Sequence, residues 1–216
     1  MEMLIETPLR KLLSGVPAIP VMTVREVQES VEVAKALYAG GLTVFEITLR
    51  TPQAWAAVEA LQKELPEAHL GIGTVSKAEQ LRQAQEAGVG FAVSAALHLP
   101  LVEAAQKLGL PYLPGTETAS EIFAAREAGC TTLKLFPAVA SLGMERLKDF
   151  APVFPGVDFV PTGGISSNNF RSFLSKPNVL TVGGGWMMPK QVVADKNWRA
   201  IEFTARSIVA TADTED

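Results

Sequence analysis

Stretches rich in Ala, Glu, Gln and Lys alternate with short apolar runs along this chain. The polar-rich stretches have the composition of helices, and four of them end at or beside a glycine: 26–40, 77–87, 99–108 and 118–128. Glycine is a common signal for the C-terminus of a helix, because it adopts a left-handed conformation without steric cost. A run rich in strand-forming residues follows each of these glycines. The pattern therefore predicts a repeated helix–strand unit.

The short apolar runs give eight candidate strands: 17–22, 43–48, 69–73, 91–94, 111–114, 131–136, 157–161 and 179–183. Their apolar character is typical of parallel strands that are covered on both faces, and their alternation with helices implies βαβ units. Eight such units in a chain of 216 residues predict an α/β fold of the (β/α)8 TIM-barrel class. A doubly wound open sheet is the structural alternative, although no GxGxxG motif follows an early strand.

A single domain is expected over residues 1–216, because no linker rich in Pro, Ser or Gly divides the chain. Residues 1–15 predict a short amphipathic N-terminal helix rather than a signal peptide, and residues 211–216 predict a disordered tail. No uncharged apolar run approaches the roughly 20 residues that span a membrane. We therefore expect a cytoplasmic protein without a membrane partner.

The amino-acid composition argues against several functional classes of protein. The net charge of −4 and the pI near 5.3 argue against a nucleic-acid partner, which would usually require a basic patch. The single cysteine, Cys130, excludes an intramolecular disulfide and any site built from several cysteines. His69 and His98 lack a partner at the spacing of metal ligands. We expect neither a metal nor a cofactor.

Active-site groups of a barrel lie at the C-terminal ends of its strands, and one of these ends holds an unusual lysine. Lys134 lies within Leu133-Lys134-Leu135-Phe136, a run that should be buried. Strand alternation puts Leu133 and Leu135 on the face toward the helices and Lys134 on the face toward the barrel interior. Burial favours the neutral amine, which is the form that attacks a ketone. Lys134 is therefore a candidate Schiff-base nucleophile.

Glu46 has the same peculiarity, because it lies in the apolar run Val44-Phe45-Glu46-Ile47-Thr48 and shares a face with Val44 and Thr48. An inward carboxylate near Lys134 could accept and return protons. The alternative interpretation is a buried Lys–Glu ion pair without chemistry.

Polar residues at neighbouring strand ends are candidates for substrate binding. Arg50 could bind a substrate carboxylate through two parallel hydrogen bonds, or it could be a solvated surface arginine. Thr74 could donate to the same carboxylate, or it could cap a helix. Ser94 ends the fourth candidate strand.

Glycine clusters follow the seventh and eighth candidate strands, at Thr162-Gly163-Gly164 and Gly183-Gly184-Gly185. TIM barrels frequently bind phosphate in these two loops, and glycines expose backbone N–H groups to an anion. Tight turns would explain either cluster alone. We predict a phosphate cradle that includes Thr162, Gly163, Gly164, Gly184 and Gly185.

These segments together resemble the class I aldolases of 2-keto-3-deoxy-6-phosphogluconate (KDPG) and 4-hydroxy-2-oxoglutarate (KHG), over nearly the whole chain. The resemblance lies in the order and spacing of four segments: 40–50 (GGLTVFEITLR), 71–75 (GIGTV), 133–138 (LKLFPA) and 161–165 (PTGGI).

The resemblance implies a role for each matching residue. It implies that Lys134 is the Schiff-base lysine and that Glu46 is the general acid and base. It implies that Arg50 and Thr74 bind the pyruvyl carboxylate and that Phe136 is an aromatic wall beside the imine. It implies that Gly163 and Gly164 belong to the phosphate cradle. It further implies a homotrimer that needs no metal.

The chain departs from the family pattern at three places. Relatives usually read Ser-Pro-Gly where this chain has Ser94-Ala95-Ala96, in the loop beside the pyruvyl end of the site. They usually have Glu at the position of Val139, and Ser at the position of Gly185. Loss of one hydroxyl that binds a charged group costs on the order of 1.5–3 kcal/mol, which puts the preference for a phosphorylated substrate in question.

The sequence thus predicts a carbon–carbon lyase that acts on a small 2-keto acid. It would cleave KDPG to pyruvate and glyceraldehyde 3-phosphate, or KHG to pyruvate and glyoxylate, or both. Three alternatives stay open. The same pyruvate imine could decarboxylate oxaloacetate. The chain could be a phosphate-binding isomerase or synthase in which Lys134 is only an ion-pair partner. It could also be a non-catalytic, self-assembling scaffold.

Overall fold

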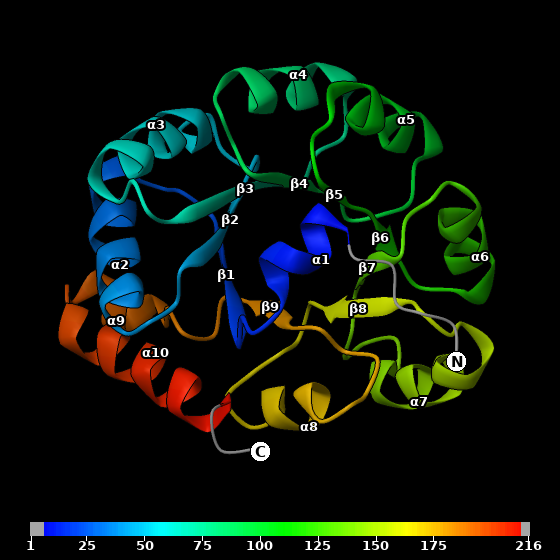
Figure 1. The fold of residues 1–216 in the computed structure, drawn as a ribbon. Coiled ribbons are helices and arrows are strands. Elements are labelled where there is room, and N and C mark those ends of the chain that lie inside the picture. The colour runs from blue at the N-terminus through cyan, green and yellow to red at the C-terminus, as the bar shows by residue number, and fades with distance from the viewer. Residues whose placement is uncertain (1–6, 213–216) are drawn as a thin grey trace.

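A computed structural model describes residues 7–212, in which strands and helices alternate along the chain (Figure 1). The helices are α1 (Pro8–Leu13), α2 (Val27–Ala39), α3 (Ala54–Glu64), α4 (Ala78–Glu86), α5 (Leu99–Leu108), α6 (Ala119–Glu127), α7 (Gly143–Val153), α8 (Phe170–Leu174), α9 (Lys190–Ala194) and α10 (Trp198–Ala212). The strands are β1 (Ala18–Met22), β2 (Val44–Thr48), β3 (His69–Gly73), β4 (Phe91–Val93), β5 (Tyr112–Leu113), β6 (Gly115–Thr116), β7 (Thr132–Leu135), β8 (Asp158–Pro161) and β9 (Val182–Gly184).

The strands form two curled parallel sheets. One sheet has six strands in the order β5-β4-β3-β2-β1-β9, and the other has three in the order β6-β7-β8. Pro114 separates β5 from β6, and isolated parallel bridges join Phe159 to Val179 and Thr162 to Gly183. Figure 1 shows the strands arranged around α1, with the other helices outside them. The structure confirms the predicted α/β class and the parallel strands.

Apolar side chains pack in two layers, one on each face of the sheets. Outward residues such as Phe45, Ile47, Leu133 and Leu135 are buried against the helices. The inner layer consists of Leu9, Leu13, Ile19, Val44, Phe91, Val93, Leu113 and Val160. Successive residues of a strand point to opposite faces, so both layers follow from the alternation along each strand.

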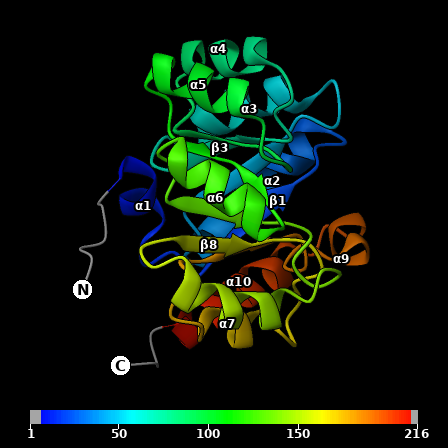
Figure 2. The same cartoon turned by 90° about the vertical axis from the view of Figure 1, so that its right-hand side faces the viewer.

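Helix α1 supplies two leucines to the inner layer and lies at one end of the curled sheets (Figure 2). Thr7 caps this helix by accepting a hydrogen bond from the Arg10 N–H, and Arg10 Nε lies 2.6 Å from Asp158 Oδ2 at the start of β8. Of the predicted N-terminal helix, residues 1–6 lie outside the described residues. Helix α10 includes Thr211 and Ala212, and the rest of the predicted tail, residues 213–216, also lies outside them.

The four helices that the glycine signals predicted are present as α2, α4, α5 and α6. Gly109 shows why the signal works, because its φ of 66° is the left-handed conformation that ends α5. Among residues 7–212 no helix is long and apolar enough to cross a membrane.

Candidate active site

Lys134 on β7 and Glu46 on β2 face one another on the inner side of the two curled sheets. Lys134 Nζ lies 3.2 Å from Glu46 Oε1 and 3.3 Å from Oε2, and each side chain is only 5% exposed. Leu133 and Leu135, on either side of the lysine, belong to the outer apolar layer. The inward orientation predicted for Lys134 and Glu46 is therefore confirmed.

The buried pair has the geometry for proton transfer. Each charge offsets the cost of removing the other from water, which is why both can be buried. The contact is within the range over which a carboxylate takes a proton from an amine, and that transfer would leave Lys134 neutral and nucleophilic. Buried pairs also occur in ordinary protein cores, so the groups around this one decide its role.

Gly73 on β3 makes room for the Glu46 carboxylate, and sequence reasoning did not single it out. A Cβ at position 73 would lie 2.2 Å from Glu46 Oε1 and 2.7 Å from its Cγ and Cδ. Gly71, on the same face of β3, makes room for the Phe91 ring in the same way. A glycine within a strand marks a close approach of another group, and this was the available signal in Gly71-Ile72-Gly73.

Thr74 follows β3 in a strained conformation. Its φ of 62° is in the left-handed region, which costs a β-branched residue roughly 1–2 kcal/mol. The next residue of this turn, Val75, is held by a hydrogen bond of 3.0 Å from its N–H to the Val93 carbonyl. Lys77, not Thr74, occupies the N-cap position of helix α4, so the helix-cap interpretation of Thr74 is wrong. Strain of this kind often accompanies functional sites.

Arg50 lies just after β2 and is exposed. Within residues 7–212 its guanidinium makes no hydrogen bond or ion pair with another side chain or carbonyl. Its exposure agrees with a surface arginine, and its free donors agree with a role in binding a carboxylate. Thr74 and Arg50 follow β3 and β2, which are neighbouring strands with their C-terminal ends at the same edge.

Ser94 is buried, and its hydroxyl is already engaged. It donates to the Ala96 carbonyl at 2.8 Å and accepts from the Tyr112 hydroxyl at 2.7 Å. Burial raises the pKa of Tyr112 to about 12, so the phenol stays protonated and can donate this bond. Ser94 therefore fixes its own loop against β5. Ser94, Ala95, Ala96 and Thr74 line one pocket, of about 310 Å³.

The glycines after β8 bring that loop against the loop after β7. Gly163 and Gly164 have φ values of 94° and 82°, which favour glycine. A Cβ at Gly163 would lie 3.1 Å from the Phe136 ring, and one at Gly164 would lie 2.6 Å from Val139. Phe136 is half-buried, and the centre of its ring is 5.6 Å from Lys134 Nζ. Phe136, which the resemblance makes an aromatic wall, thus lies beside the lysine, and its role stays a prediction.

The three glycines at the end of β9, of which Gly183 and Gly184 lie in the strand and Gly185 follows it, differ in whether packing requires them. A Cβ at Gly183 would lie 2.6 Å from Thr162 Oγ1, and one at Gly184 would lie 2.6 Å from the Trp186 ring. A Cβ at Gly185 would meet nothing closer than the Val21 carbonyl oxygen, at 3.6 Å. Packing therefore requires glycine at 183 and 184, whereas a side chain fits at 185.

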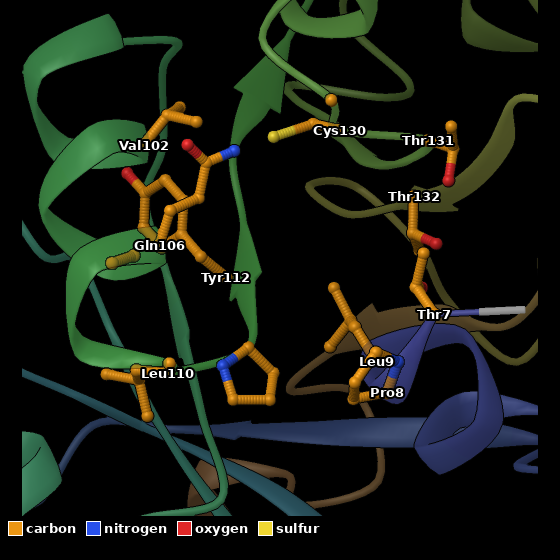
Figure 3. Close-up of a pocket in the computed structure, with 14 residues that line it drawn as sticks. Thr7, Pro8, Leu9, Val102, Gln106, Leu110, Tyr112, Cys130, Thr131 and Thr132 are labelled. Carbon is orange, nitrogen blue, oxygen red and sulfur yellow. The ribbon is translucent and has the colours of Figure 1, made fainter.

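A further cavity, of about 220 Å³, lies where helix α1 meets α5 and the start of β7 (Figure 3). Figure 3 shows the Cys130 thiol directed toward Gln106 and Tyr112 in this cavity. Burial raises the pKa of Cys130 to about 11, so the thiol stays protonated and unreactive. None of the predicted site residues lines this cavity. Residues 7–212 contain no group of three or more His, Cys, Asp or Glu that could hold a metal ion.

Comparison with known proteins shows the family to which this chain belongs. Residues 9–204 match the family model described as KDPG and KHG aldolase. The KHG/KDPG aldolase of Escherichia coli (strain K12) is 40% identical over 207 residues, which are 96% of this chain and 97% of that protein. The chain therefore belongs to the KDPG and KHG aldolase family.

Two solved structures of relatives resemble this one closely. The KDPG aldolase of Legionella pneumophila, in which pyruvate was captured as a covalent carbinolamine intermediate, has a TM-score of 0.89 and 37% identity and covers 94% of this chain and 98% of that one. The KDPG aldolase of Zymomonas mobilis ZM4 with 3-phosphoglycerate has a TM-score of 0.87 and 37% identity and covers 94% and 95%.

Proposed function

We propose that this protein is a class I aldolase that cleaves KDPG to pyruvate and glyceraldehyde 3-phosphate, and also cleaves KHG to pyruvate and glyoxylate. The observation that carries the proposal is the buried contact of 3.2 Å between Lys134 and Glu46, in a chain of this family. The carbinolamine in the Legionella relative supports covalent chemistry between a protein group and pyruvate.

The first half of the reaction forms the imine. Glu46 takes a proton from Lys134, and the neutral amine attacks the C2 carbonyl of the bound 2-keto acid. The carbinolamine that results loses water as Glu46 returns the proton to its hydroxyl. The product is a protonated imine, whose positive charge can accept an electron pair from the neighbouring carbon.

The second half breaks the carbon–carbon bond. Glu46, directly or through a water, takes the proton of the C4 hydroxyl. The electrons of the C3–C4 bond move into the protonated imine, so an aldehyde leaves and an enamine remains on Lys134. Glu46 then protonates C3, and water hydrolyses the imine to release pyruvate and the free lysine.

The other predicted residues hold the substrate in this mechanism. Arg50 and Thr74 bind the C1 carboxylate at the ends of β2 and β3, and Phe136 covers one face of the imine. Ser94 acts by holding the loop Ala95-Ala96 rather than by direct contact. Backbone groups of the loops after β8 and β9 bind the part of the substrate that leaves as the aldehyde.

The architecture behind this proposal is a single-domain (β/α)8 barrel that assembles as a homotrimer. We take β5 and β6 as one strand that is interrupted at Pro114, because proline lacks the N–H needed for a ladder hydrogen bond. The bridges between β8 and the β9 segment support closure of the ring. Phe123 on α6 and Val153 on α7 are large and exposed, and these neighbouring helices could carry the contact between copies.

A substrate panel tests the proposal. We expect the wild-type protein to release pyruvate from KDPG and KHG, and Lys134→Met to release none, because methionine fills similar space without an amine. Pyruvate is measured by a coupled dehydrogenase assay, with oxaloacetate as the third substrate. Faster turnover of oxaloacetate than of KDPG or KHG would favour the alternative function, decarboxylation of oxaloacetate. Substantial activity of Lys134→Met would show that the lysine is only an ion-pair partner.

A further inference from the structure

The loop after β4, residues 94–96, reaches the inner face of the sheets beside Lys134. A Cβ at Gly115 on β6 would lie 2.3 Å from both the carbonyl carbon and the carbonyl oxygen of Ala95. Gly115 pairs in register with Lys134 on the neighbouring parallel strand. Residues paired in this way point to the same face of a sheet, so the Ala95 carbonyl occupies the space beside Lys134 that a side chain at 115 would fill.

The same loop borders the other end of the candidate site. Thr74 and residues 94–96 line one pocket, of about 310 Å³. Thr74 directly follows Gly73, the residue that makes room for the Glu46 carboxylate. A keto acid with its carbonyl carbon at Lys134 and its carboxylate at Thr74 therefore has this loop beside its pyruvyl part.

A chain of two hydrogen bonds holds the loop from the outer face of the sheet. Tyr112 on β5 packs in the outer apolar layer and is 9% exposed. Its hydroxyl donates to Ser94 Oγ at 2.7 Å, and Ser94 Oγ donates to the Ala96 carbonyl at 2.8 Å. Alanine side chains form no hydrogen bond, so Ser94 is the residue of the loop through which a side chain can fix its position.

We propose that Tyr112 is a positioning residue for the pyruvyl part of the substrate, and that it acts through Ser94 to keep the Ala95 carbonyl beside Lys134. The inference rests on the proposed aldolase function and adds to it a residue on the far face of the sheet. The pyruvyl part is common to KDPG and KHG, so the Tyr112 hydroxyl affects both substrates alike.

Kinetics of Tyr112→Phe separate this role from a general effect on folding. The variant removes the hydroxyl and keeps the packed ring. We expect KM for KDPG and for KHG to rise by the same factor, about threefold to tenfold, because one hydrogen bond between neutral groups is lost. A purely structural effect would reduce the amount of folded enzyme, which lowers the apparent kcat and leaves KM unchanged. Tyr38→Phe on α2, at the other tyrosine of the chain, is the matched control and should keep the wild-type KM.

A double-mutant cycle tests whether Tyr112 acts through Ser94. Ser94→Ala removes both hydrogen bonds of the chain, so it should raise KM at least as much as Tyr112→Phe does. Tyr112→Phe in the Ser94→Ala background should change KM no further, because the acceptor of the phenol is already absent. The same increase of KM in both backgrounds would overturn the proposal.

Amide hydrogen exchange tests the hydrogen-bond chain without turnover. The Ser94 N–H donates to the Leu113 carbonyl at 3.2 Å, so its exchange rate reports opening of the loop. We expect Tyr112→Phe to speed this exchange by about threefold to tenfold, and Tyr38→Phe to leave it unchanged. An unchanged exchange rate or an unchanged KM in Tyr112→Phe would overturn the proposal. Failure of the wild-type protein to release pyruvate, with exchange as expected, would instead refute the aldolase function and leave the hold of Tyr112 on the loop intact.

Discussion

At the scale of single residues, a charged side chain within an apolar strand was the feature of the sequence that indicated the candidate site. Lys134 and Glu46 each interrupt a buried run, so alternation alone was enough to turn both inward. Gly73 and Tyr112 could not be found in this way. Their importance comes from contacts with Glu46 and Ser94, which are distant in sequence, and such contacts exist only after the strands have paired.

Gly73→Ala tests whether the position of the Glu46 carboxylate limits the rate. The added methyl group would lie 2.2 Å from Oε1, so the carboxylate must leave the position in which it contacts Lys134. A displacement of about 1 Å at a reacting group costs on the order of a hundredfold in rate. We therefore expect kcat for KDPG to fall by about that factor, while the protein stays folded.

Gly90→Ala is the matched control for this variant, because a Cβ there meets only the Leu70 carbonyl oxygen, at 3.5 Å. It should retain wild-type kcat. A Gly73→Ala protein that also retains wild-type kcat would show that Glu46 does not act from the position seen in the structure.

At the scale of elements, the existence of strands and helices was more predictable than their ends. The predicted strand 111–114 is found as the two short strands β5 and β6 on either side of Pro114. The predicted run 131–136 is shorter, because Phe136 leaves the strand and turns toward Gly163. Ends of this kind depend on which hydrogen-bond partners the neighbouring strand offers, and a single run of sequence does not contain that information.

The turn after β3 gives a prediction at the same scale. Thr74 has a left-handed backbone, so Thr74→Ala keeps the strain and Thr74→Gly relieves it. Thr74→Gly should therefore be more stable than Thr74→Ala by about 1 kcal/mol, measured by urea unfolding. Both variants lose the hydroxyl, and both should raise KM for pyruvyl substrates. Equal stability of the two variants would mean that the turn relaxes without strain.

At the scale of the whole molecule, the repeat of helix and strand was sufficient to predict the α/β class, and the fold agrees with that of family members at TM-scores of 0.89 and 0.87. The contact between the two sheets was harder to predict, since it includes pairings as small as the bridge between Thr162 and Gly183. The pairing of β1 with β9 brings Arg25, after β1, into the lining of the same pocket as Gly185, after β9. These residues are 160 positions apart in the sequence, so no local pattern could show that they lie together.

Reductive trapping tests the central claim most directly. Pyruvate is added to the folded protein, sodium borohydride reduces any imine, and peptide mass spectrometry locates the adduct. The account predicts one pyruvyl adduct, on Lys134, and none in Lys134→Met. An adduct confined to another lysine, or none at all in folded wild-type protein, would contradict it.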